Sequence, residues 1–309
     1  MKEVKFSKDT KPAEEEEEMS AEEAARLYSE GGFYIVKDLP VGTEFGCDMK
    51  SYNTGLLTYF KFDVILHLFD SGLKFLGLKM IPKGCHFLYY SSVGKDSDVS
   101  PRRGFFINIE PGEVIVHRFD PKTEDIVDDV SADEVERFRL NLRNIDGQLG
   151  VYPFGSWSKW VSLSSRLNMD LIQKYKVKSD AGDNSLLDVT YNFTAVTKQK
   201  YPDGASAAEI SLHSLDSSFQ LDTWLRHNES SDAVLVELQL AFIVFLVGQQ
   251  YVSFNQWKLV VDMMCGCGES LDKYPKLFIS FLNDLHFQVI LHSVETELGH
   301  EKKWLKRFQ

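Results

Sequence analysis

The sequence of 309 residues has few cysteines, no long apolar run and no excess of basic charge. Four cysteines, Cys47, Cys85, Cys265 and Cys267, predict no disulfide framework and favour a reducing compartment. The two longest apolar runs, residues 56–69 and 233–247, are shorter than the ~20 residues that a membrane span requires. The N-terminus is acidic and has no apolar signal core. A soluble protein of the cytoplasm and nucleus is expected.

The formal net charge of -12 disfavours direct binding to nucleic acid, because a protein that holds phosphates usually presents Lys and Arg on one face. Part of this charge lies in the run Glu14 to Glu18. Like charges repel and bury no apolar area, so residues 1–19 are predicted to form a disordered acidic tail.

The sequence also lacks the motifs of common enzymes and metal sites. Gly94-Lys95 has no first glycine at the spacing of a phosphate-binding loop, and Ser156 lacks the glycine pattern of a hydrolase nucleophile. Cys265 and Cys267 are one residue apart, which is unusual for zinc. His86 and His117 are isolated in predicted strands and are interpreted as structural. We therefore predict no catalytic, cofactor-binding or metal-binding residue. The protein is expected to bind a partner and not to act as an enzyme.

Short segments rich in branched and aromatic residues, separated by Pro and Gly, predict strands in the first half of the chain. They are residues 33–36, 43–47, 73–81, 86–91, 103–109 and 113–119. Because Pro111-Gly112 is a short connection, the last two are predicted to pair as an antiparallel hairpin. An antiparallel sheet or small barrel is the expected architecture.

A helix is predicted to begin at the capping box Ser131-Ala132-Asp133-Glu134 and to cover one face of this sheet. Its apolar residues recur at spacings of three and four: Val135, Phe138, Leu142, Ile145 and Leu149. Trp157 and Trp160 are expected to pack at the end of the same domain, with a partner contact as the alternative. The β-rich N-terminal domain is thus predicted to span residues 20–175.

The second half of the chain has a different pattern. Residues 176–205 have the polar, weakly periodic composition of a linker. A capping box at Ser206 to Glu209 then begins a region of helical periodicity, so residues 206–309 are predicted to form an all-α C-terminal domain. The fold class predicted from the sequence is α+β.

Three longer segments resemble the AAR-two (AAR2) splicing-factor family. They are residues 39–46 (LPVGTEFG), residues 77–87 (GLKMIPKGCHF) and residues 237–248 (ELQLAFIVFLVG). The resemblance implies a non-enzymatic assembly factor of the U-five snRNP in pre-mRNA splicing. It also implies that the protein binds the RNase H-like and Jab/MPN-like domains of the large core protein PRP-eight and holds off the helicase BRR-two until maturation. The alternative is a generic helical protein–protein adaptor outside splicing.

Two segments depart from the family pattern. Residues 55–71 look like an extra insertion, which is either a translated intron or a real structural addition. After Gln288 the tail is atypical, which suggests the hypothesis that the helical domain is truncated in comparison with the family. In that case the apolar face of Phe278, Phe281 and Leu285 is expected to lose its cover.

Overall fold

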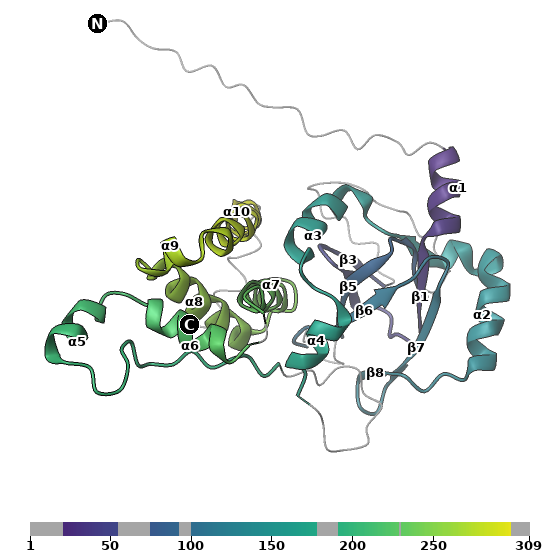
Figure 1. Ribbon diagram of the computed structural model, residues 1–309. Helices are drawn as coiled ribbons and strands as arrows, with labels where there is room; N and C mark the ends of the chain where they lie inside the picture. Colours follow the sequence, from purple (N-terminus) through teal and green to yellow (C-terminus); the bar gives the residue numbers. More distant parts are fainter. Residues whose placement is uncertain (1–20, 55–74, 93–99, 178–190, 229, 298–309) are drawn as a thin grey trace, which may run out of the picture.

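The computed structural model describes residues 21–54, 75–92, 100–177, 191–228 and 230–297, with a β-rich region followed by helices (Figure 1). The predicted α+β class is confirmed. The predicted tail at 1–19 and insertion at 55–71 lie outside the described residues. The predicted domain boundaries and the possible truncation after 288 remain predictions.

Within the described residues, nine strands form two sheets. The first sheet is antiparallel throughout, in the order β3 (Lys50–Asn53), β2 (Glu44–Cys47), β5 (Gly84–Ser91) and β6 (Arg103–Ile109). The second is mixed, in the order β8 (Asp125–Val127), β7 (Val114–Asp120), β1 (Gly32–Lys37), β4 (Gly77–Ile81) and β9 (Leu149–Val151). Its β1–β7 and β4–β9 pairs are parallel.

The predicted hairpin between residues 103–109 and 113–119 is wrong, because the two strands belong to different sheets. β6 pairs with β5, whereas β7 pairs in parallel with β1. Gly112 has φ +68°, and the Pro111-Gly112 turn does reverse the chain. The reversed chain then enters the other sheet. A short turn fixes the reversal and leaves the pairing partner to the tertiary packing.

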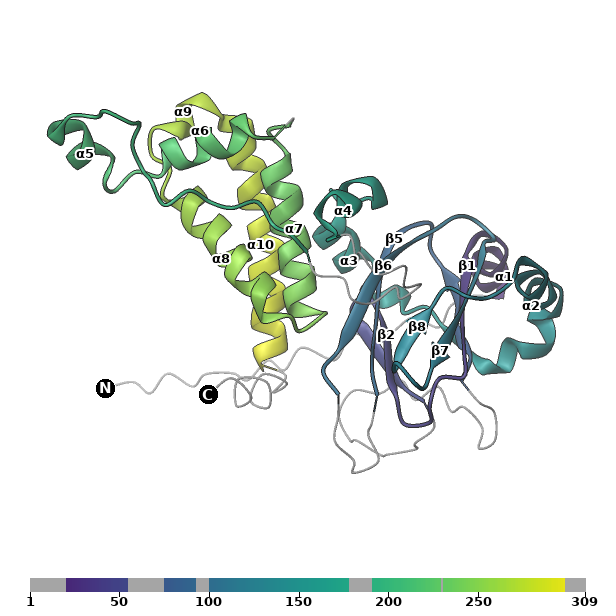
Figure 2. The ribbon, with the colours of Figure 1, turned by 90° about the horizontal axis from the view of Figure 1, so that it is seen from below.

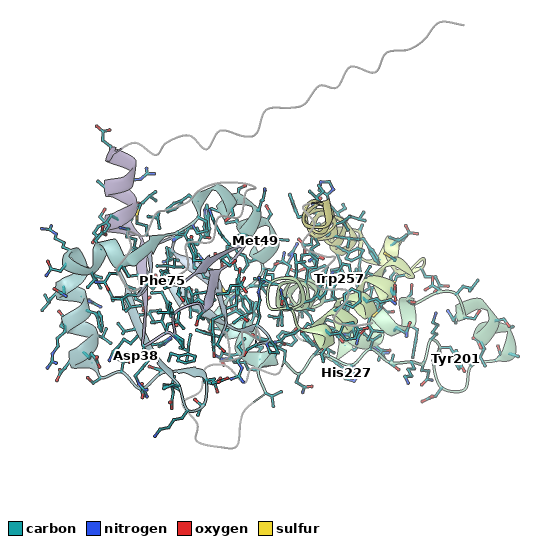
Figure 3. The ribbon with its side chains drawn as sticks, turned by 180° about the vertical axis from the view of Figure 1, so that it is seen from behind. Asp38, Met49, Phe75, Tyr201, His227 and Trp257 are labelled. Atoms are coloured by element: carbon teal, nitrogen blue, oxygen red, sulfur yellow. The ribbon has the colours of Figure 1, made fainter. Side chains whose placement is uncertain are left out.

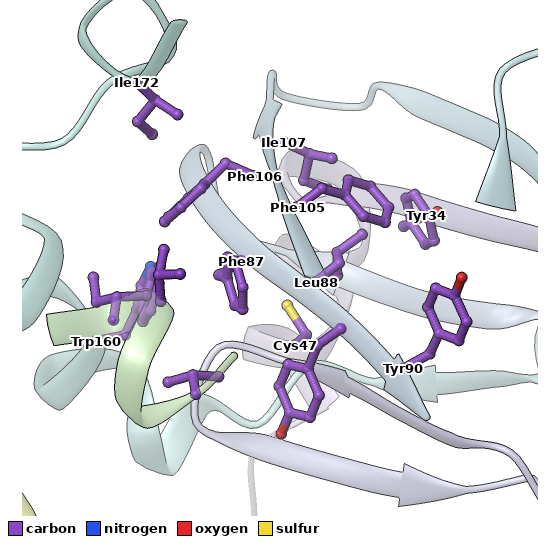
Figure 4. Packing of buried hydrophobic residues seen from close by; sticks show 14 of the residues in the cluster. Tyr34, Cys47, Phe87, Leu88, Tyr90, Phe105, Phe106, Ile107, Trp160 and Ile172 are labelled. Carbon is purple, nitrogen blue, oxygen red and sulfur yellow. The ribbon is translucent and has the colours of Figure 1, made fainter. Parts of the chain in front are cut away.

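Aromatic side chains fill the space between the two sheets (Figure 4). Tyr34 of β1 stacks on Phe45 of β2, with ring centroids 5.9 Å apart. Phe105 of β6 faces His117 of β7 across the same core, with centroids 6.1 Å apart. The rings of Tyr34, Phe45 and Phe105 are buried, and each contributes about 2 kcal/mol by leaving water. The core therefore explains why β6 and β7 face each other without pairing.

Two helices pack against the five-stranded sheet. α1 (Ala21–Glu30) leads into β1, and α2 (Ala132–Ile145) covers the outer face, as predicted. The predicted helix is too long at its end, because Asp146–Gln148 forms a 3-10 turn, η1, before β9 begins. Lys79 Nζ binds Asp146 Oδ1 at 2.7 Å, which fixes this turn and places Leu149 in a strand of the same core.

The remaining helices form the second half of the molecule. They are α3 (Trp157–Ser164, after the 3-10 turn η2 at Phe154–Ser156), α4 (Met169–Tyr175), α5 (Ala207–His213), α6 (Ser218–Arg226), α7 (Ala233–Leu246), α8 (Tyr251–Cys265), α9 (Ser270–Lys273) and α10 (Pro275–Glu297). Figure 2 shows α3 and α4 between the strands and the bundle of α7, α8 and α10. Tyr201, in the segment that leads to α5, lies far out at the end of the molecule (Figure 3).

Helix α7 is the centre of the helical region. Its residues from Val234 to Phe245 are all buried, and it packs against α8, α10 and α3. One part of α7, including Leu240 and Val244, shares a hydrophobic cluster with Phe87 and Phe106 of the strands. A helix that is apolar all round requires cover on every side. Here both the sheet region and the other helices supply that cover.

Candidate functional site

The first candidate is a buried cluster of potential metal ligands in the β-rich region. One ligand atom each of Cys47, Asp48 and His86 lies within 4.8 Å of the others, and all three residues are buried. The sequence predicts a structural role for His86, and no sequence motif singles out Asp48. Three buried groups of these types are able in principle to bind a cation or transfer a proton.

The hydrogen bonds of this cluster are already used within the protein. Asp48 Oδ2 is 2.7 Å from His86 Nδ1 and accepts from the Tyr152 hydroxyl at 2.6 Å. Asp48 Oδ1 accepts from the Phe87 backbone N–H at 2.9 Å. The second imidazole nitrogen, Nε2, lies 2.8 Å from the carbonyl oxygen of Pro82. Neither ring nitrogen is left for a substrate or metal, so Asp48 ties β2, β5 and the segment after β9 together.

The surroundings of His86 also close the cluster. Its ring stacks on Trp157 and Trp160, with centroids 5.7 Å and 6.5 Å away, and Trp160 Nε1 donates to the Cys85 carbonyl. Burial raises the pKa of the Cys47 thiol well above its ordinary value and that of Cys85 to about 12. Thiols that stay protonated are poor nucleophiles. We interpret the cluster as structural, as the sequence analysis predicted for His86.

His117 is likewise satisfied within the core. Its Nδ1 lies 3.0 Å from the Tyr34 hydroxyl, and burial lowers its pKa to about 4. The imidazole is therefore neutral near pH 7. Cys267 is buried and donates to the Met263 carbonyl, whereas Cys265 is exposed. His117 and Cys267 are thus both buried and hydrogen-bonded within the described part of the chain.

The second candidate is the junction of α7 with the segments around it, where a buried carboxyl joins several elements. Glu237 Oε1 accepts from the Thr194 backbone N–H at 2.9 Å and from Gln256 Nε2 of α8 at 2.6 Å. Gln256 also donates to the Thr194 carbonyl at 3.0 Å. The Tyr175 hydroxyl of α4 is a further donor beside this carboxyl. Burial nevertheless dominates and raises the pKa of Glu237 to about 7.

Gln239, two residues further along α7, projects to another side of the helix and anchors the turn between α3 and α4. Its Oε1 accepts from the Arg166 backbone N–H at 3.0 Å, and its Nε2 donates to Ser165 Oγ at 3.2 Å. Arg166 Nε in turn binds Asp284 Oδ2 of α10 at 2.7 Å. Burial raises the pKa of Asp284 in spite of this arginine. The two polar residues of α7 thus hold opposite neighbours, since residues two apart on a helix differ by about 200°.

A third connection joins the four-stranded sheet to the end of α7. Arg102 Nη2 donates to Glu44 Oε1 at 2.7 Å, and its Nη1 donates to the Val247 carbonyl at 3.0 Å. Its guanidinium lies over the Tyr89 ring, 4.5 Å from the centroid. A cation at a helix C-terminus is favourable because the last carbonyls there have no partner in the helix. Arg102, Gln239 and Glu237 therefore fix α7 against both halves of the molecule.

Few features of the sequence predict this junction. Glu237 and Gln239 lie inside an apolar run, and a polar residue in such a run is the available signal that a buried hydrogen-bond partner exists. The partners Thr194, Arg166 and Asp284 are far away in the chain, so local pattern does not identify them.

None of the described helices, α10 with its 23 residues included, is long and apolar enough to cross a membrane.

Comparison with known proteins places both halves of the chain in one family. Residues 56–177 match the family model of the AAR2 N-terminal domain, and residues 193–306 match that of the AAR2 C-terminal repeat region. The chain is 31% identical to Protein AAR2 homolog of Mus musculus and 30% to that of Homo sapiens, in each case over 88% of this chain and 79% of the relative. It is 26% identical to the homolog of Caenorhabditis elegans, over 85% of this chain and 80% of the relative. The chain belongs to the AAR2 family.

Proposed function

We propose that this protein is a non-enzymatic assembly factor of the U-five snRNP in pre-mRNA splicing. It binds the RNase H-like and Jab/MPN-like domains of the large core protein PRP-eight. In this way it holds off the helicase BRR-two until maturation. It acts in the cytoplasm and nucleus. The observation that carries the proposal is the match of both halves of the chain to the AAR2 family.

The chemistry of the described residues supports a binding role. The buried group that most resembles an acid–base pair, Asp48 with His86, has its hydrogen-bonding atoms engaged by Tyr152, Phe87 and Pro82. A catalytic pair requires a free atom within hydrogen-bond reach of a substrate. The hydrogen bonds around α7 hold the sheet region and the helical region in a fixed orientation. A preorganised surface of this kind loses little conformational entropy when it binds a large partner.

The test is recovery of partners with the tagged full chain from cell extract, followed by binding to the purified RNase H-like and Jab/MPN-like domains. We expect PRP-eight without BRR-two, and we expect added BRR-two to compete. The exposed substitution Glu136→Ala is the matched control and retains binding, whereas Asp48→Ala, which disrupts the sheet region, loses it. Equal recovery with both variants would indicate capture of unfolded chain and would contradict the proposal. Recovery of a different partner would favour the generic adaptor.

A further inference from the structure

Residues 192–197 run across the helices toward α5 without regular secondary structure (Figure 2), and we call them the strap. At its start, Asn192 N–H donates to the Tyr175 carbonyl of α4 at 2.7 Å. Phe193 packs against the hydrophobic cluster of the strands and α7, whereas Val196 packs against the cluster of α6, α7, α8 and α10. The strap therefore joins the two hydrophobic clusters that meet at α7.

The middle of the strap is attached to α7 through a carboxyl group. Thr194 N–H donates to Glu237 Oε1 of α7 at 2.9 Å, and the Thr194 carbonyl accepts from Gln256 Nε2 of α8. The same Gln256 amide donates to Glu237 Oε1. The protonation state of one buried side chain thus bears directly on how firmly the strap is held.

The surroundings of Glu237 suit the protonated carboxyl. The residue is fully buried, and its Oε2 has no hydrogen-bond partner among the described residues. A protonated carboxyl keeps Oε1 as the acceptor and carries its proton on Oε2, whereas a carboxylate needs donors at both oxygens. Burial outweighs the hydrogen bonds from Thr194, Gln256 and Tyr175, and it raises the pKa of Glu237 to about 7.

The titratable groups on the elements around this carboxyl do not neutralise it. The Tyr175 hydroxyl of α4 keeps its proton, because burial raises its pKa well above the ordinary value. Asp284 of α10 is bound to Arg166, and Lys159 of α3 and Lys258 of α8 are exposed. The strap itself has no acidic or basic residue. An ionised carboxylate at this site therefore depends on water for its stabilisation.

The strap is the cover of Glu237 that yields most readily to water. Helix α7 is buried from Val234 to Phe245 and packs against three other helices. In the strap, by contrast, Asn192 and Ala195 are exposed. Irregular segments with exposed backbone open locally at a lower free energy than packed helices do. Lifting the strap admits water to the carboxylate, and water also replaces the hydrogen bonds that the strap gives up.

We propose that the strap is a proton-controlled latch, which is seated on α7 while Glu237 is protonated and lifts when Glu237 ionises. Lifting withdraws Phe193 and Val196 from the two clusters, and this loosens the coupling between the β-rich half and the helical half. The proposal is independent of the proposed role in U-five snRNP assembly.

The test is amide hydrogen exchange of the full chain at pH 6 and pH 8, with each rate corrected for the chemical exchange rate at that pH. The carboxyl has a pKa of about 7 when the strap is seated and an ordinary value of 4.5 in water. The opening equilibrium of the strap is therefore expected to be about 10-fold more favourable at pH 8. Glu237→Gln removes this change. Glu136→Gln, the same substitution at an exposed site of α2, is the matched control and keeps it.

Three results would overturn the proposal. One is equal protection of the strap at both pH values in the wild type, and another is the same loss of protection in Glu237→Gln. The third is protection of the strap identical to that of β5, because it would mean that the strap opens only when the whole chain unfolds.

A second measurement requires no substitution. The ¹³C resonance of the Glu237 carboxyl carbon in the wild-type chain is expected to titrate together with the exchange of the strap. A carboxyl that titrates near its ordinary value of 4.5 would contradict the latch.

Discussion

Two of the buried carboxyl groups among the described residues, Asp48 in the β-rich region and Glu237 in α7, are used in different ways. Asp48 accepts from two side chains and a backbone N–H that all belong to the β-rich region and the segment directly after it. Glu237 accepts from a segment outside the regular elements and from another helix, and its Oε2 has no hydrogen-bond partner among the described residues. Asp48 therefore completes a local core, whereas Glu237 joins separate elements and keeps one oxygen without a hydrogen bond among the described residues.

The largest expected effect follows from breaking the Asp48 cluster. Asp48→Ala leaves His86, the Tyr152 hydroxyl and the Phe87 N–H buried without their shared acceptor, so we expect a loss of about 3–5 kcal/mol in the free energy of unfolding. Urea denaturation followed by fluorescence measures it. Glu136→Ala, at an exposed position, is the control, and a change of similar size in both variants would contradict the role of the cluster.

The next effect is the pH dependence contributed by Glu237. The pKa of this group is about 7 in the folded protein, against an ordinary value of 4.5, so the folded state binds the proton more tightly than the unfolded state. Its contribution to stability is therefore fully present below pH 4.5 and is lost as the pH rises through about 7. The size of this loss is about 3 kcal/mol.

Glu237→Gln removes this titration and keeps the shape of the side chain. Unfolding free energies measured for both proteins from pH 4.5 to 8 are expected to show that the wild type loses stability relative to the variant across this interval. Asp48 is not changed in either protein, so its contribution cancels in the difference. Parallel curves for the two proteins would contradict the burial of an unsatisfied carboxyl at this site.

A smaller effect is expected at the connection between the α3–α4 turn and α10. Arg166→Ala leaves the carboxylate of Asp284, whose side chain is 7% exposed, without its cation, and we expect a loss of about 2 kcal/mol. Amide hydrogen exchange of α10 is the measurement, with faster exchange expected near Asp284 than in α2. Uniform acceleration over the whole chain would indicate global destabilisation instead of a local connection.

The smallest effect is expected at an exposed ion pair. Arg139 and Glu136 lie on the solvent side of α2, 3.6 Å apart, and more than half of each side chain is exposed. Arg139→Ala is expected to change the free energy of unfolding by less than ~0.5 kcal/mol, because water and salt screen such pairs. A loss comparable to that of Arg166→Ala would show that exposure does not separate the two kinds of pair.

Local pattern was sufficient for most of the elements. The predicted strands at 33–36, 86–91 and 103–109 correspond to β1, β5 and β6. Ser131 and Ser206 cap the helices that begin after them, and the full capping box forms at Ser206 with Glu209, whereas the Glu134 carboxylate binds Lys37. These features depend on neighbours within a few residues, which is the range over which side-chain period and capping act. The pairing of the strands could not be predicted in this way, because β6 and β7 lie in different sheets.

The candidate sites were harder to predict from the sequence than the helices and strands. His86 is interpreted as structural from the sequence, but its partner Asp48 lies 38 residues earlier, in the turn between β2 and β3. Glu237 and Asp284 depend on Thr194 and Arg166 in the same way. A truncated helical domain is expected to leave Phe278, Phe281 and Leu285 uncovered, whereas the structure buries the two phenylalanines and packs Leu285 beside them.

The sequence by itself determined the α+β class, the positions of most strands and helices, and the membership in the AAR2 family through residues 39–46, 77–87 and 237–248. Tertiary structure alone decided which strands pair, which buried carboxyl is satisfied, and which face of α10 meets solvent. The physical reason is range. Secondary structure follows from periodicity and caps between residues a few positions apart, whereas burial and hydrogen-bond satisfaction depend on side chains that folding brings together from distant parts of the chain.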